Sequence, residues 1–265
     1  MRIGAVSYLN TKPLVYGLQQ LAPQAEMLFD LPSRLADRLA AGELDVALIP
    51  SIEFFQSPGY SIVSDACIGC RGPVLSVKLL SRVPLERIRT LALDEGSRTS
   101  AALVRILLAE RFDLRPELLP FPIDARPESL AADALLMIGD RAMHPPAGPF
   151  LATWDLGDEW CRWAELPFVF AMWVARAGND VAGLDDILSQ ARDNGVAHLA
   201  GIAEREHAAV GLAYDQTLTY LRDNLYFYLG PRELAGLQLF YEHASRLGLA
   251  PRGRDIVGQA PSLAT

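Results

Sequence analysis

The chain has little cysteine and no long apolar run. Its 265 residues contain three cysteines, which are too few for the disulfide framework of a secreted protein and favour a reducing compartment. The longest strongly apolar stretch, residues 166–175, falls well short of the ~20 residues that span a bilayer. The first residues lack the apolar segment and cleavage site of a signal peptide. We therefore expect a cytoplasmic protein without a membrane partner.

Positive charge is scarce as well. The 24 lysines and arginines are outnumbered by 32 aspartates and glutamates, which gives a net charge of −8. A groove for the phosphate backbone of a nucleic acid needs an excess of Lys and Arg, so we do not expect nucleic acid as a partner. The hydrophobic fraction of 51% and the charged fraction of 21% indicate a globular chain and exclude a disordered one.

Sequence signatures of metal and cofactor chemistry are also missing. No GxSxG, GxGxxG or HExxH motif occurs. The four histidines lack the spacing of metal ligands, and only His144 follows a strand near an expected cleft, as a minor candidate for a general base. Cys67 and Cys70 form a CxxC pair, but a zinc site requires a second pair and only Cys161 remains. We expect neither a metal nor an organic cofactor.

Strands alternate with helices over most of the chain. Buried apolar patterns predict strands at residues 2–7, 26–29, 45–49, 91–93, 118–121, 134–138 and 168–175. Strands that alternate with helices form parallel sheets covered on both faces, so the predicted fold class is α/β. After residue 178 the pattern predicts only helices, at residues 184–194, 213–224 and 231–247.

These elements predict two lobes. We expect a first lobe from residues 1–86 together with 176–265, and an inserted second lobe from residues 87–175, which the strand at 168–175 closes. Two crossing strands would join the lobes. Because ligands of open α/β sheets bind at the carboxyl ends of strands, we expect a ligand cleft between the two lobes.

The turn Ser97-Arg98-Thr99-Ser100 is the strongest candidate for an anion site. It follows a predicted strand and opens a helix, so free backbone N–H groups, three hydroxyls and a guanidinium can converge on a carboxylate. The same residues also suit ordinary helix capping, and the local sequence does not decide between the two interpretations.

Two further segments are candidates for the cleft. Tyr8-Leu9-Asn10-Thr11 occupies the equivalent turn of the first lobe, where the Asn10 amide can both donate and accept hydrogen bonds, although helix capping explains this turn too. Ser76 lies between apolar residues on a possible crossing strand, where its hydroxyl would face either the cleft or neighbouring backbone.

Three segments together resemble one known family. They are residues 4–14 (GAVSYLNTKPL), residues 42–51 (GELDVALIPS) and residues 72–77 (GPVLSV). They resemble the menaquinone-biosynthesis family of the futalosine pathway, in particular its chorismate dehydratase branch, and the resemblance extends to residues 97–108. It implies a type 2 periplasmic-binding-protein fold used as an enzyme. It also implies the loss of water from chorismate to give 3-[(1-carboxyvinyl)oxy]benzoate.

The resemblance also implies roles for individual residues. Asn10 and Ser76 match positions of the active site, where they would hold the departing hydroxyl, the enolpyruvyl group or a carboxylate. Removal of the ring proton would be assisted by the substrate's own carboxylate. The remaining candidates are substrate-binding residues in or near the shared motifs, and they are Tyr8, Thr11, Ser51, Ser97, Arg98, Thr99 and Ser100.

Two other functions stay open. The sister branch of the family makes 1,4-dihydroxy-6-naphthoate, but it typically opens with a Pro-Cys-Pro-Asn-Asp turn where this chain has Tyr8-Leu9-Asn10-Thr11. A non-catalytic cytoplasmic protein that binds a carboxylate is the second alternative, because the same two-lobed fold also serves as a passive binding protein. The partner expected in each case is a small carboxylate, for chorismate a dicarboxylate, and the sequence predicts no oligomeric state.

Overall fold

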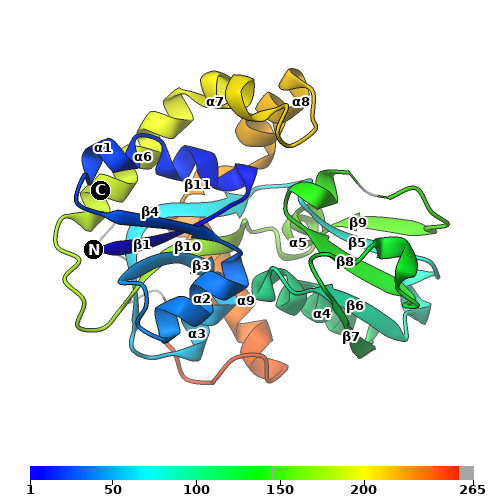
Figure 1. Ribbon diagram of the computed structural model, residues 1–265. Coiled ribbons are helices and arrows are strands. Elements are labelled where there is room, and N and C mark those ends of the chain that lie inside the picture. The colour runs from blue at the N-terminus through cyan, green and yellow to red at the C-terminus, as the bar shows by residue number, and fades with distance from the viewer. Residues whose placement is uncertain (145, 257–265) are drawn as a thin grey trace.

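The computed structural model describes residues 1–144 and 146–256, which form two β-sheets with helices around them. Figure 1 shows the sheets side by side. The first has six strands in the order β11-β4-β10-β3-β1-β2 and the second has five in the order β7-β6-β8-β5-β9. We call each sheet with its helices a lobe. The two-lobed α/β fold that the sequence predicts is thereby confirmed.

The first sheet is built on three parallel strands. β1 pairs in parallel with β2 and β3, and β10 then adds antiparallel to β3 and β4. The five residues of β3 are fully buried and apolar, as a central parallel strand requires. The bounds are β1 Arg2–Val6, β2 Glu26–Asp30, β3 Val46–Pro50, β4 Tyr60–Cys70, β10 Phe168–Arg176 and β11 Tyr226–Tyr228.

Helices cover both faces of this sheet. In the view of Figure 1, α6 and α7 lie above it and α2, α3 and α9 lie below it. The helical elements of the first lobe are the 3₁₀ helix η1 Leu9–Val15, α1 Leu18–Leu21, α2 Pro32–Ala40, α3 Ser51–Gln56, α6 Leu184–Ala197, α7 Leu199–Glu206, α8 Tyr214–Thr219, a π-helical turn Tyr220–Asn224 and α9 Pro231–Arg246. None of the helices in the described ranges has the length and apolarity that a bilayer span requires.

The second sheet also has parallel strands at its centre. β6 pairs in parallel with β7 and β8, and β5 adds antiparallel to β8 and β9. The helix α4 begins where Ser97 accepts a hydrogen bond from the Ser100 backbone, and it ends at Asp113 in a left-handed conformation. The bounds are β5 Val77–Ser81, η2 Leu85–Arg87, β6 Thr90–Asp94, α4 Arg98–Phe112, β7 Glu117–Phe121, η3 Pro127–Ser129, β8 Ala134–Ile138, η4 Asp140–Met143, β9 Ala152–Asp155 and α5 Leu156–Ala164.

The expected boundaries at residues 87 and 175 do not coincide with the sheets. The strand expected to close the second lobe is β10, which pairs with β3 and β4 in the first sheet. Conversely β5, which lies inside the range expected for the first lobe, pairs with β8 and β9 in the second. The chain therefore crosses between the sheets after β4 and again before β10. The region after residue 178 also holds the short strand β11, which was not expected.

Candidate functional site

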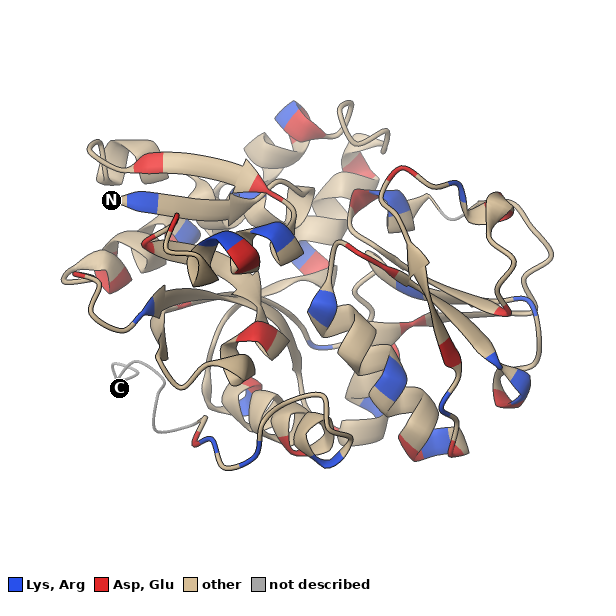
Figure 2. Ribbon diagram, turned by 60° about the horizontal axis from the view of Figure 1, so that its bottom comes forward, with Lys and Arg blue, Asp and Glu red and all other residues tan. Residues whose placement is uncertain are grey.

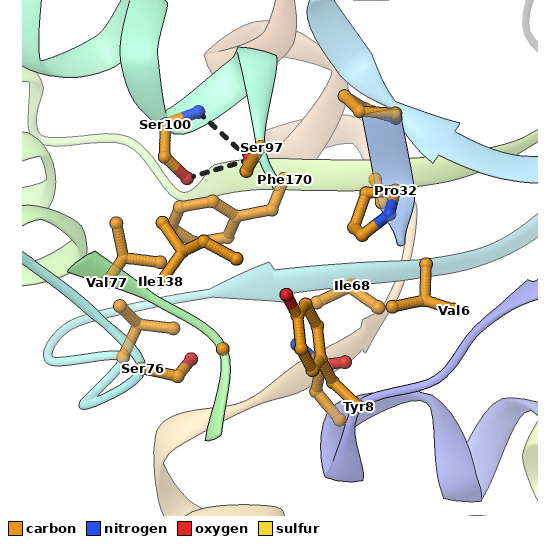
Figure 3. A pocket seen from close by; sticks show the side chains of 15 residues that line it. Val6, Tyr8, Pro32, Ile68, Ser76, Val77, Ser97, Ser100, Ile138 and Phe170 are labelled. Atoms are coloured by element: carbon orange, nitrogen blue, oxygen red, sulfur yellow. Dashed lines mark hydrogen bonds between the residues drawn. The ribbon is translucent and has the colours of Figure 1, made fainter. Parts of the chain in front are cut away.

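A pocket of about 470 Å³ lies between the two lobes, and we call it the interlobe pocket. That volume includes space open to solvent. Figure 3 shows Tyr8 from the first lobe and Ser97 and Ser100 from the second around the same space. Its polar side chains are Tyr8, Asn10, Ser76, Ser97 and Ser100, and its apolar walls include Val6, Ile68, Val77, Ile138 and Phe170.

No charged side chain is among the residues that line the interlobe pocket in the described part of the chain. Elsewhere basic and acidic residues are interspersed over both lobes (Figure 2). The nearby charges of Asp94 and Arg141 are paired with each other, since Arg141 Nε donates to Asp94 Oδ2 at 3.0 Å. An anion in this pocket therefore has to be bound by hydroxyl, amide and backbone N–H groups and by a helix N-terminus.

Tyr8 reaches from the turn after β1 to the second lobe. A Cβ atom at Gly139 would lie 2.7 Å from the Tyr8 ring, so only glycine leaves room for it there. Gly139 also has a φ of +69°, which a side chain would strain. The Tyr8 hydroxyl is buried without a hydrogen-bond partner among the described residues. Burial and the Asp94 carboxylate raise the pKa of Tyr8, so the hydroxyl stays protonated and can donate to a ligand.

Ser76 contacts a residue outside the pocket lining, Tyr220. The Tyr220 hydroxyl donates to Ser76 Oγ at 2.9 Å. Tyr220 begins the π-helical turn and is fully buried. Sequence reasoning missed it. Tyr220 lies in a π-helical turn, a feature often found at functional sites. Such a turn is defined by i→i+5 hydrogen bonds, which a sequence pattern does not reveal.

The N-terminus of α4 faces the pocket with two hydroxyls. Ser97 Oγ accepts a hydrogen bond from the Ser100 backbone at 3.3 Å and lies 3.0 Å from Ser100 Oγ. Both side chains line the interlobe pocket as well. The two interpretations of this turn are therefore compatible, because Ser97 caps the helix while its hydroxyl remains on the pocket wall. The helix end itself carries a partial positive charge that favours a carboxylate.

Arg98 and Thr99 lie outside the pocket lining. Arg98 Nη2 lies 2.9 Å from Asp37 and Nη1 lies 3.3 Å from Glu53, both in the first lobe. Thr99 is buried, and its hydroxyl accepts a hydrogen bond from the Ile52 backbone at 3.2 Å. Both residues, expected to contact substrate, instead hold the two lobes together.

Ser51 and Thr11 are also turned away from the pocket lining. The Ser51 hydroxyl donates to the carbonyl of Val169 at 2.8 Å and lies 3.3 Å from the Thr99 hydroxyl, so it belongs to the same contact between the lobes. Thr11 is buried, and its hydroxyl donates to Asn10 Oδ1 at 3.3 Å. Its contact with a ligand would be indirect, through the orientation of the Asn10 amide.

The discounted candidates lie away from the interlobe pocket. His144 Nε2 lies 2.8 Å from the carbonyl oxygen of Val210 and is not part of the lining. Cys67 and Cys70 are buried on β4 and are free thiols. Within residues 1–144 and 146–256, no group of three His, Cys, Asp or Glu residues has the arrangement of a metal site.

Comparisons with known proteins give a consistent result. A family model described as menaquinone biosynthesis matches residues 1–246. A chorismate dehydratase of Thermus thermophilus is 29% identical over 273 residues, which cover 94% of this chain and 96% of that protein.

Solved structures show the fold. Protein AF1704 of Archaeoglobus fulgidus superposes with a TM-score of 0.72 at 14% identity, covering 94% of this chain and 97% of that one. The periplasmic aliphatic sulphonate-binding protein SsuA of Escherichia coli has a TM-score of 0.64 at 17% identity, with 98% and 96% covered. The fold is therefore that of the periplasmic binding proteins.

Proposed function

The chain belongs to this menaquinone-biosynthesis family, and we propose that it removes water from chorismate to give 3-[(1-carboxyvinyl)oxy]benzoate. The ring loses the proton at C3 and the hydroxyl at C4, which leave together as one water molecule while the ring becomes aromatic. No oxidation or reduction by a second molecule is needed. We place the reaction in the cytoplasm, as the free cysteines favour.

The observation that carries this proposal is an uncharged interlobe pocket that holds Asn10 and Ser76 in a chain of this family. Chorismate carries two carboxylates, and the N-terminus of α4 with the Ser97 and Ser100 hydroxyls offers a site for the one on the ring. The polar groups around Tyr8, Asn10 and Ser76 are then left for the enolpyruvyl group and the C4 hydroxyl.

A pocket without an ionisable base suits a reaction in which the substrate supplies the base. We propose that the enolpyruvyl carboxylate takes the C3 proton. Hydrogen bonds from Ser76 or Asn10 then stabilise the C4 hydroxyl as it departs. The departing hydroxyl takes the proton from the enolpyruvyl carboxyl group and leaves as water, which restores the carboxylate. The gain in aromaticity provides the driving force, so the protein contributes by orienting the substrate and excluding water.

The test is to incubate the purified, EDTA-treated protein with chorismate and to detect the product by mass. We expect a product lighter by one water that matches 3-[(1-carboxyvinyl)oxy]benzoate. If a folded sample leaves chorismate unchanged, the proposal is wrong. The substrate of the sister branch and then a screen for bound carboxylates would test the two alternatives.

Replacing Arg98 should have a small effect on this reaction. An exposed ion pair contributes at most about 1 kcal/mol, so Arg98→Met should lower kcat/KM for chorismate by no more than about fivefold. The reason is that Arg98 contacts Asp37 and Glu53 and does not line the pocket. Steady-state kinetics measure the effect, and a loss of about 100-fold or more would mean that the guanidinium binds substrate directly.

A further inference from the structure

We propose that Tyr220 and Asp155 are positioning residues that aim the Ser76 hydroxyl into the interlobe pocket as a hydrogen-bond donor. This inference rests on the proposed dehydratase function and extends it to two residues that do not themselves line the pocket. Each acts on Ser76 from a different side, Tyr220 through the hydroxyl and Asp155 through the backbone.

Tyr220 fixes the direction of the Ser76 hydroxyl. A phenol has one proton, and Tyr220 donates it to Ser76 Oγ at 2.9 Å. Burial raises the pKa of Tyr220, so the phenol keeps that proton. The Ser76 proton has no other acceptor among the described residues and is free to point into the pocket.

Asp155 holds the backbone that carries Ser76. The segment turns within three residues, because the Ser76 backbone N–H donates to the carbonyl of Val74 at 2.7 Å. Leu75, at the centre of this turn, has a φ of +61°, which is uncommon for a residue with a side chain. Such a γ-turn is strained and persists only where its surroundings hold it.

The Asp155 carboxylate supplies that hold. Its Oδ1 atom accepts from the Val74 backbone at 2.9 Å and its Oδ2 atom accepts from the Leu75 backbone at 2.6 Å. The same carboxylate caps α5 through the Gly157 backbone at 3.0 Å, which anchors it to a helix. Helix capping alone does not require the bonds to Val74 and Leu75. The arrangement therefore ties the strained turn, and with it Ser76, to the start of α5.

The experiment begins with Tyr220→Phe, which removes only the hydroxyl. We expect kcat for chorismate to fall about tenfold while KM stays within about twofold, because the lost orientation matters mainly in the transition state. Tyr241→Phe is the matched control. It also removes a hydrogen-bonded hydroxyl from a buried tyrosine, since Tyr241 donates to the carbonyl of Pro251 at 2.9 Å. This control should leave kcat unchanged.

A double-mutant cycle separates positioning from a general loss of structure. In a Ser76→Ala background, Tyr220→Phe should change kcat by less than about twofold, because the group that it positions is gone. Asp155→Asn keeps a helix cap but not both carboxylate oxygens. It should lower kcat about fivefold in the wild-type background. In the Ser76→Ala background it should cause no further loss of kcat.

Two results would overturn the inference. Either Tyr220→Phe retains full turnover, or it lowers kcat by the same factor with and without the Ser76 hydroxyl, as a purely structural role would. Failure of the proposed function gives a different result, in which the folded wild-type protein itself does not dehydrate chorismate.

Discussion

We expect Asn10→Ala to slow the dehydration of chorismate by about 100-fold or more, the cost typical of removing one preorganised hydrogen-bond donor from a site where charge develops. Asn10 lines the interlobe pocket, and its Oδ1 atom accepts a hydrogen bond from the Thr11 hydroxyl at 3.3 Å. The alanine side chain itself cannot hydrogen-bond the departing hydroxyl or the enolpyruvyl group. The measurement is kcat and kcat/KM on chorismate, with the product identified by mass.

Asn179→Ala is the control for the loss of an asparagine side chain. Its amide donates to the carbonyl of Asp45 at 2.6 Å, and it is not part of the pocket lining. This variant loses a hydrogen bond of the fold but should keep wild-type turnover. If Asn10→Ala stays within about twofold of the wild-type rate, Asn10 has no catalytic role and the proposed mechanism fails at that residue.

The second large effect is expected on stability, at Gly195. A Cβ atom there would lie 1.9 Å from the carbonyl oxygen of Pro13, so α6 or η1 must move if any side chain is added. Overpacking against rigid backbone costs stability, and we expect Gly195→Ala to lower the free energy of unfolding by about 3 kcal/mol. Because η1 also carries Asn10, turnover should fall with it.

Gly201→Ala is the matched control in the next helix, α7. Its Cβ atom would lie 3.7 Å from the guanidinium of Arg205, an ordinary contact. An alanine in a helix is favoured over glycine by about 1 kcal/mol, so this variant should be neutral or slightly more stable. Denaturant unfolding of both variants measures the difference. Equal stability of the two would show that α6 and η1 are not packed as tightly as the structure indicates.

Much of the fold could be predicted because burial leaves a pattern in the sequence. The apolar segments that become β1, β3, β6 and β8 are recognisable as strands wherever they pack. Sheet membership is different. The strands β5 and β10 are apolar along most of their length, and an apolar pattern reports that a strand is buried but not which sheet buries it. The pairing of β5 with β8 and of β10 with β3 is what assigns each strand to its sheet.

The sequence by itself determined the α/β class, the family resemblance and the turns that contribute Tyr8, Asn10, Ser76 and Ser97 to the pocket. Only the tertiary structure decided which neighbours of these residues turn away. Arg98 and Thr99 adjoin Ser97, yet their side chains are directed by Asp37, Glu53 and Ile52 in the other lobe.

Tyr220 is a second case in which local sequence could not predict a contact. It is separated from Ser76 by 144 positions and meets it only because the last helices fold back onto the first lobe. Local sequence fixes backbone propensity and hydrophobic pattern, which depend on near neighbours. The direction of a polar side chain depends on the partners that folding brings opposite it, and those are set by the whole chain.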